Sequence, residues 1–236
     1  METRTPLTPF PVATPTPRGL VGHLAYHIAM GLSRLLLRIE VEGRDRLPTA
    51  PPYVLAANHE TYIDGMWVGA FLPRGHFRRF CSLAASDLKT KHGWLGKVIL
   101  QVGRGIQVDR FGNPVRGLII AKKEVEKGGI LLVHPEGTRS EDGGLGEFKD
   151  GAAYVSMKAG VPLVPVFIDG GYEIFNRHFK NPKPFLPGTL RRKSLVITYG
   201  QPLLPGDYKD AHEMTAALIA WMEERAAHKR VPRLPG

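Results

Sequence analysis

Apolar residues recur every three or four positions from residue 19 to residue 37, the spacing that keeps side chains on one face of an α-helix. The members of this stripe are Leu20, Val21, Leu24, Ile28, Leu32, Leu35 and Leu36, and Ile39 continues the spacing just beyond it. The polar residues of the segment fall largely outside the stripe. The pattern therefore predicts an amphipathic helix over residues 19–37.

Beyond this helix the pattern changes to short apolar runs of strand length. We predict strands at Tyr53–Ala57, Phe80–Ala85, Ile106–Val108, Ile130–Val133, Leu163–Ile168 and Leu195–Tyr199. Segments of helical length lie among them, at about 87–101, 113–127, 150–159 and 208–228. Alternation of this kind is typical of α/β proteins with parallel strands. We expect a single layered α/β domain with a mostly parallel central sheet flanked by helices.

Composition agrees with one globular domain. The chain has 236 residues, of which 43% are hydrophobic and 23% charged. Its single cysteine, Cys81, excludes an internal disulfide framework and a cysteine-based metal cluster. Residues 1–18 are rich in proline and lack the apolar core of a signal peptide. We divide the chain into a flexible proline-rich arm at 1–18, the amphipathic helix at 19–37, the main domain at 38–228 and a basic tail at 229–236.

The net formal charge of +10 is distributed unevenly along the chain. Residues 174–206 carry several arginines and lysines without an acidic residue, and residues 88–108 show the same bias. Such surfaces attract polyanions: nucleic acid, anionic lipid or a phosphorylated ligand. A charge excess that only keeps the protein in solution is the alternative.

The first polar cluster, Asn58 to Asp64, directly follows the predicted strand Tyr53–Ala57. His59 can take a proton from a hydroxyl near neutral pH if a carboxylate such as Asp64 holds its tautomer and stabilises the imidazolium. On one continuous helix these two side chains would point about 140° apart. They can meet only if His59 lies in the turn and Asp64 in the first helical turn beyond it. The alternative is that Asn58 or Thr61 caps a helix and His59 has no chemical role.

The second cluster, Pro135 to Ser140, follows the predicted strand Ile130–Val133. A glycine-rich stretch comes next, and then Lys149 at the start of a predicted helix. Backbone amides at a helix start, together with Arg139 and Lys149, would form an anion site. An ordinary polar turn is the alternative for this cluster.

Two weaker patterns complete the set. The segment from Arg104 to Arg110 is predicted to form a short strand with basic residues at either end. The segment from Gly160 to Val166 is predicted to be a tight turn that leads into a buried strand, with prolines that shape the sheet edge.

Taken in order, these segments resemble the four motif blocks of the glycerolipid acyltransferases, whose best-known members are the lysophosphatidic acid (1-acylglycerol-3-phosphate) acyltransferases. The blocks are Asn58-His59-x4-Asp64, Gly105-Ile106-x-Val108-x-Arg110, Pro135-Glu136-Gly137-Thr138-Arg139-Ser140 and Val164-Pro165-Val166. The first and third blocks are specific, and the other two are loose. The resemblance spans about residues 40–200.

This resemblance implies an O-acyltransferase that moves a fatty acyl group from acyl-CoA or an acyl carrier protein to the hydroxyl of a lysophosphatidic acid-like acceptor. His59 would deprotonate the hydroxyl, Asp64 would orient His59, and residues 38–228 would form the acyltransferase domain. The residues expected to bind the phosphorylated acceptor are Arg110, Glu136, Gly137, Thr138, Arg139 and Lys149. No metal or redox cofactor is expected, because the thioester already carries an activated acyl group.

Three positions depart from the family pattern. His134 precedes the third block, where an aromatic or aliphatic residue is typical, Thr61 stands where serine is common, and Gln107 interrupts the apolar run of the second block. These departures keep the class of reaction and leave the acceptor open. The same chemistry on another lysolipid, an amino-acid lipid or a specialised metabolite is the first alternative.

Two other classes of protein fit the sequence less well. A non-catalytic lipid- or nucleic-acid-binding module would account for the basic runs, in which Phe175, Phe179 and Phe185 are interleaved. Such a module has no use for a base such as His59, and we expect no nucleic-acid partner. A metal-dependent phosphohydrolase would need further His or Asp ligands at suitable spacing, and the sequence offers no such set.

The predicted helix 19–37 indicates where in the cell the protein lies. No uninterrupted apolar stretch approaches the roughly 20 residues that a spanning helix needs, and Arg34 and Arg38 would be costly at mid-bilayer. Such a helix suits the membrane interface, with basic segments such as 174–193 near anionic headgroups. We expect a cytoplasmic protein bound peripherally to the inner face of the membrane, with an anionic lipid surface as partner. The alternative is that the stripe packs against the domain's own sheet.

Overall fold

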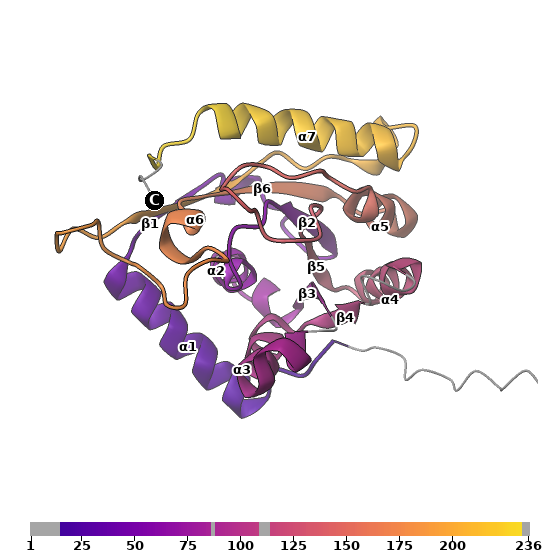
Figure 1. Ribbon diagram of the computed structural model, residues 1–236. Coiled ribbons are helices and arrows are strands. Elements are labelled where there is room, and N and C mark those ends of the chain that lie inside the picture. Colours follow the sequence, from indigo (N-terminus) through magenta and orange to yellow (C-terminus); the bar gives the residue numbers. More distant parts are fainter. Residues whose placement is uncertain (1–14, 86–87, 109–113, 233–236) are drawn as a thin grey trace, which may run out of the picture.

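The computed structural model describes residues 15–85, 88–108 and 114–232, and Figure 1 shows their arrangement. The strands are β1 (Arg38–Glu42), β2 (Tyr53–Ala57), β3 (Phe80–Ala85), β4 (Ile106–Val108), β5 (Ile130–Val133), β6 (Leu163–Asp169) and β7 (Ser194–Tyr199). The α-helices are α1 (Gly19–Leu36), α2 (Asp64–Ala70), α3 (Leu88–Gly103), α4 (Pro114–Glu126), α5 (Gly151–Ala159), α6 (Gly171–Phe175) and α7 (Ala211–Ala227).

Within the described residues, these strands form one sheet in the order β1-β7-β6-β2-β5-β3-β4. Neighbouring strands are parallel except β6 and β7, which pair antiparallel. The predicted α/β class and mostly parallel sheet are confirmed. The prediction misses β1, although its sequence Arg-Ile-Glu-Val-Glu alternates charged and apolar residues as half-buried strands do. Ile39 also continues the helical spacing of the preceding segment, so the pattern groups it with the stripe of the predicted helix.

Helices cover both faces of the sheet (Figure 1). α4, α5 and α7 lie on one face, and α1, α2 and α3 lie together on the other. Each face has its own apolar core, with Trp67 of α2 in one and Met214 of α7 in the other. The central strands β2, β5 and β6 are buried along their whole length, as expected when helices cover both faces of a sheet.

Helix α1 covers nearly the whole predicted range, but its apolar stripe faces outward. The exposed members are Leu20, Val21, Leu24, Ile28, Leu32 and Leu35, with exposed fractions from 50% to 84%. The opposite side of the helix contacts the domain, where Tyr26 and Met30 are buried and Ser33 Oγ accepts a hydrogen bond from Trp67 Nε1. The alternative in which the stripe packs on the sheet is therefore wrong. No helix in the described part of the chain is long and apolar enough to cross a bilayer.

The strand order decides where the polar clusters meet. β2 and β5 are parallel neighbours, with Ala56 opposite Val133. Their carboxyl ends therefore lie side by side at one edge of the sheet, and the turns that follow them meet there. Asn58 secures this edge to β6, because its side chain donates to the Ile168 carbonyl at 2.9 Å and accepts from the Ile168 amide at 2.7 Å.

Candidate functional site

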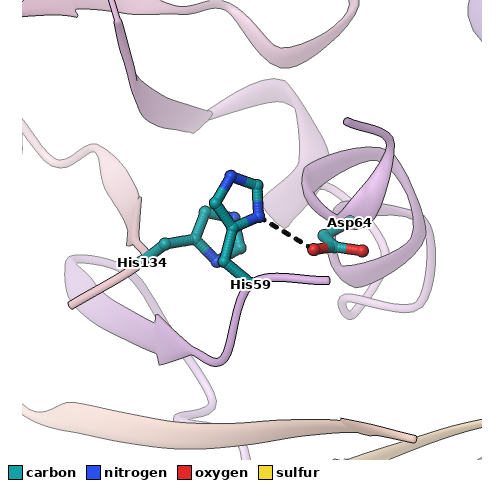
Figure 2. A group of neighbouring side chains, drawn as sticks. All are labelled: His59, Asp64 and His134. Carbon is teal, nitrogen blue, oxygen red and sulfur yellow. Dashed lines mark hydrogen bonds and ion pairs between the residues drawn. The ribbon is translucent and has the colours of Figure 1, made fainter. Parts of the chain in front are cut away.

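Asp64 organises the turn between β2 and α2. It is the first residue of α2 and has no solvent exposure. Its Oδ2 accepts hydrogen bonds from His59 Nδ1 at 2.9 Å and from the amides of Glu60 and Thr61, both at 2.8 Å. Its Oδ1 accepts one from the Thr61 hydroxyl at 2.7 Å. His59 thus lies in the turn and Asp64 in the first helical turn, which lets the two side chains meet (Figure 2).

These hydrogen bonds set the charge of Asp64 and the tautomer of His59. Burial alone would raise the pKa of the Asp64 carboxyl, but the hydrogen bond and charge of His59 outweigh it and hold that pKa below its usual value. A carboxylate only accepts, so His59 Nδ1 carries a proton. Nε2 of the neutral ring then carries a lone pair, and it lies on the side of the ring away from Asp64 (Figure 2). This is the arrangement of a general base.

A second carboxylate joins the turn after β5 to the His59 turn. Glu136 Oε1 accepts a hydrogen bond from the His59 amide at 2.8 Å, and Oε2 accepts one from the Gly146 amide at 2.9 Å. The Ser140 amide donates in turn to the His59 carbonyl at 2.7 Å. Burial raises the pKa of Glu136 against the opposing effect of these amides. Glu136 therefore holds backbone segments together, a role that the family resemblance does not include.

His134 lies directly against His59. The two imidazole rings stack with their centroids 4.0 Å apart and their planes 13° from parallel. Nδ1 of His134 is 3.1 Å from the carbonyl oxygen of Ala57 and 3.0 Å from that of Asn58, so this nitrogen must carry the proton that it donates. Burial, reinforced by the charge of His59, lowers the pKa of His134 to about 3. His134 is therefore a neutral ring in one tautomer that supports His59 from one side.

His59, Asp64 and His134 each place a ligand-type atom within 4.8 Å of the others. Their orientation does not suit a single metal ion. The lone pairs of stacked rings lie in parallel planes and do not converge on one point at the zinc–nitrogen distance of about 2.0–2.1 Å. The oxygens of Asp64 also accept four hydrogen bonds already. The group is better described as a base, its orienting carboxylate and a supporting ring.

A cavity of about 340 Å³ lies beside His59. Polar residues of its lining are His59, Tyr62, Ser82, His134, Thr138, Arg139 and Arg177. Apolar residues of its lining include Ala25 and Ala29 of α1, Met66 of α2, and Val98 and Ile99 of α3. The cavity therefore combines a polar reaction site with room for an apolar group.

Arg139 brings a cationic donor to this cavity. Its guanidinium carbon lies 3.5 Å from the centroid of the Tyr62 ring. Its Nη1 is buried, and no described residue offers that nitrogen a hydrogen-bond acceptor. Burial lowers the pKa of Arg139, which reflects the cost of a charge held away from water. A phosphate or carboxylate in the cavity would supply the acceptor and the counter-charge.

The other predicted site residues differ in how close they come to the cavity. Thr138 lines it. Gly137 has φ 68°, a conformation that favours glycine, and a β-carbon placed there would lie 3.8 Å from Lys149 Nζ. Lys149 is exposed and does not line the cavity, but its amide donates to the Pro135 carbonyl beside the Arg139 turn. Arg110 lies outside the described residues.

Two residues of the site have roles that sequence reasoning misses. Arg177 lines the cavity and pairs with Glu141, but in the sequence it is one of many cations in the run 174–206. His134 is visible in the sequence only as a departure from the family pattern. Its stacking on His59 depends on the pairing of β2 with β5, which cannot be predicted from the residues next to either strand.

Comparisons with known proteins point to one family. The family model described as Acyltransferase matches residues 38–169, more than half of the chain. The 1-acyl-sn-glycerol-3-phosphate acyltransferase beta of Homo sapiens is 31% identical over 154 residues, which cover 63% of this chain and 51% of that protein. The chloroplastic 1-acyl-sn-glycerol-3-phosphate acyltransferase BAT2 of Brassica napus is 32% identical over 139 residues, which cover 56% and 38%. The match thus spans about half, or less, of the length of these relatives.

A solved structure has a similar fold. The crystal structure of the 1-acyl-sn-glycerophosphate (LPA) acyltransferase PlsC from Thermotoga maritima matches 91% of this chain and 82% of that chain with a TM-score of 0.67. The two sequences are 20% identical, so this match bears on the fold alone. It agrees with the layered α/β arrangement described above.

We expect His134 to stay neutral, with its proton on Nδ1, across the pH range in which an ordinary histidine titrates. Its pKa in the folded protein is lowered to about 3 from the ordinary value of 6.5. Below 6.5 the unfolded chain takes up a proton that the folded protein does not, so stability falls as the pH drops from 6.5 toward 3. Side-chain ¹⁵N NMR of the folded protein measures both the tautomer and the titration.

The variant His134→Phe keeps an aromatic ring against His59 and removes the titrating group. In urea unfolding it should lose less stability than the wild type between about pH 7 and about pH 5. His212→Ala is the matched control, because the His212 side chain is 86% exposed. A His134 signal that titrates like a free histidine would contradict the assignment.

Proposed function

Because this chain belongs to the acyltransferase family, we propose that it transfers a fatty acyl group from a thioester donor to the hydroxyl of a lysophosphatidic acid-like acceptor. One observation carries the proposal: the buried Asp64 holds one ring nitrogen of His59, and the His59 ring lines a cavity that is partly apolar and partly cationic. Acyl transfer between lipids needs a base at the hydroxyl, space for acyl chains and a site for the phosphate.

The proposed reaction begins with the acceptor hydroxyl at His59 Nε2. As the hydroxyl oxygen attacks the thioester carbonyl carbon, Nε2 takes the proton, and the Asp64 carboxylate stabilises the imidazolium that forms. The tetrahedral intermediate then collapses, the carbon–sulfur bond breaks, and the imidazolium returns its proton to the leaving thiolate. The products are an ester and a free thiol.

Neighbouring groups support the base in this scheme. Stacking on His134 restrains the His59 ring from one side. Glu136 holds the His59 amide, and the Ser140 amide holds the His59 carbonyl, so the backbone of the base is tied on both sides. A base whose position is fixed before the substrate arrives avoids the cost of ordering it during the reaction.

The proposed acceptor follows from the relatives and from Arg139. The curated relatives are named for 1-acyl-sn-glycerol-3-phosphate, a molecule that joins a free hydroxyl, a phosphate and an acyl chain. We assign the phosphate to the unpaired Nη1 of Arg139 and the acyl chain to the apolar lining. The family resemblance adds Arg110 and Lys149 as further cations for the phosphate. The donor is acyl-CoA or an acyl-loaded carrier protein, which present the same thioester.

We also propose that the protein works at the inner, cytoplasmic face of an anionic membrane. The exposed stripe of α1 is joined by the exposed side chains of Trp94 and Leu95 on α3, the helix packed against α1. Near the end of α1, Arg192 donates to the Leu35 carbonyl and keeps a cation beside the stripe. Apolar side chains flanked by cations suit the interface of an anionic bilayer. A membrane-bound site would also keep both acyl chains close to lipid.

Replacement of His59 by alanine should lower kcat about 10²- to 10⁴-fold with little change in KM, because a general base acts in the transition state. Asp64→Asn should also lower kcat strongly, since it lets His59 adopt the wrong tautomer. Thiol release from acyl-CoA in the presence of lysophosphatidic acid, with products identified by mass spectrometry, measures both effects. His212→Ala is the exposed-histidine control. Near-full turnover by folded His59→Ala protein would reject the assignment.

Replacement of Arg139 by alanine should raise the acceptor KM about 10- to 150-fold and leave the donor KM nearly unchanged. This factor corresponds to the free energy that a hydrogen bond to a charged group contributes. Lys149→Ala should act in the same direction more weakly. Arg74→Ala removes an exposed arginine outside the basic runs and is the control. An equal loss with an uncharged monoacylglycerol acceptor would mean that Arg139 stabilises its loop and does not bind phosphate.

Vesicle co-sedimentation tests the membrane proposal. Binding should strengthen with the fraction of anionic lipid and weaken with salt, because salt screens charge over about 10 Å at 0.1 M. The combined variant Leu24→Ser, Ile28→Ser and Leu35→Ser should lose binding, while each change alters stability by no more than about 0.5 kcal/mol at these exposed positions. Leu204→Ser, 47% exposed and outside α1 and α3, is the control. Failure of the wild-type protein to bind anionic vesicles at low salt would refute the proposal.

A further inference from the structure

Glu60 is a buried carboxylate that the proposed reaction does not use. It follows His59 directly and is 1% exposed. Its amide donates to Asp64, and its side-chain Oε2 accepts a hydrogen bond from the Tyr172 amide at 2.9 Å. Burial raises the pKa of the Glu60 carboxyl, and the charge of Lys229 opposes that rise. A cation beside a buried carboxylate offsets part of the cost of burying its charge.

Lys229 supplies that cation from a distant part of the chain. Its Nζ lies 3.2 Å from Glu60 Oε1, across a separation of 169 residues. The same Nζ donates to the Gly143 carbonyl at 2.9 Å. Gly143 belongs to the loop 141–146, which closely follows Arg139. One ammonium group therefore joins this loop to the His59–Asp64 turn.

The chain around Lys229 has its own anchors. The amides of Arg230 and Val231 both donate to Asp169 Oδ2 at the end of β6, at 2.7 and 3.0 Å. The guanidinium of Arg230 pairs with Glu40 and Glu42 of β1. The two amide hydrogen bonds to Asp169 hold the segment after α7 against the sheet, so that the Lys229 side chain reaches the site from a fixed backbone. The Arg230 ion pairs are about half exposed and contribute little to this anchoring.

We propose that Lys229 is a positioning residue of the active site, whose ammonium holds the His59–Asp64 turn and the loop 141–146 at the separation that acyl transfer needs. The proposal rests on the proposed function. An acceptor held by its phosphate at Arg139 must present its hydroxyl to His59, so the distance between the two segments decides whether the reacting atoms meet. Lys229 lies beyond the residues 38–169 that match the family.

The variant Lys229→Met, in the full chain, removes the charge and keeps a long apolar side chain. We expect kcat/KM for the acceptor to fall about tenfold or more, through a lower kcat and a higher acceptor KM, with the donor KM nearly unchanged. Lys229→Arg keeps the charge and should recover part of this loss. Arg230→Met is the matched control, because it removes a neighbouring cation whose partners lie on β1, and it should keep wild-type kinetics.

Hydrogen–deuterium exchange measures how firmly the two segments are held, and it does not require an active enzyme. In Lys229→Met the amides of residues 59–64 and 141–146 should exchange several-fold faster than in Arg230→Met. Should Lys229→Met fail to fold, Glu60→Gln removes the ion pair with little change of shape and should speed exchange in residues 59–64.

The outcomes separate the two proposals. A wild-type protein without acyl transfer would reject the proposed function, and exchange would still decide whether Lys229 holds the two segments. Wild-type kinetics in Lys229→Met, or unchanged exchange in both segments, would overturn the positioning role. Loss of activity in Arg230→Met equal to that in Lys229→Met would also overturn it, because the effect would then belong to the whole tail.

Discussion

A carboxylate without solvent exposure must be surrounded by hydrogen-bond donors, and Asp64 finds its four within the five residues that precede it. The amides of Glu60 and Thr61 and the ring of His59 can reach one carboxylate only if the chain wraps around it. This requirement produces the turn after β2 and starts α2 at Asp64. The direction of the His59 ring follows from the same requirement.

Three buried carboxylates hold the site together, each with partners at a different distance in the sequence. Asp64 is satisfied by its own turn. Glu136 is satisfied by amides of the His59 turn and of its own loop, at Gly146. Glu60 takes its cation from Lys229, after the last helix. The turn that carries the base is therefore coupled to the loop after β5 and to the segment that follows α7.

Helix α1 contributes to both the cavity and the outer surface. Ala25 and Ala29, on its inner side, line the cavity beside His59. On its outer side the large residues Leu24 and Ile28 are exposed. Small residues inside leave room for a ligand, and large residues outside present an apolar surface without filling the cavity. A lipid substrate of the proposed kind would thus lie one helix away from the surface that we assign to the membrane.

How much of the fold and of the site could be predicted depends on how far apart in the sequence the interacting residues lie. The strands β2 to β7 and the helix α1 are visible in the sequence because hydrophobic periodicity is a property of neighbouring residues. The His59–Asp64 pair is visible for the same reason, since every donor to Asp64 lies within its own turn. The edge strand β1 alternates charged and apolar residues over five positions, but its Ile39 also continues the helical spacing of α1, so the pattern alone does not separate the two elements.

The amino-acid sequence by itself determined the α/β class, the amphipathic character of α1 and the local turn that joins His59 to Asp64. The tertiary structure decided that the α1 stripe faces outward, that His134 stacks on His59, and that Lys229 is the cation beside Glu60. Each of these features depends on which strands are neighbours in the sheet and on where segments far apart in the sequence come together. A buried charge or ring takes the partner that the strand order brings to it, and residues 169 positions apart share no local pattern from which that pairing could be read.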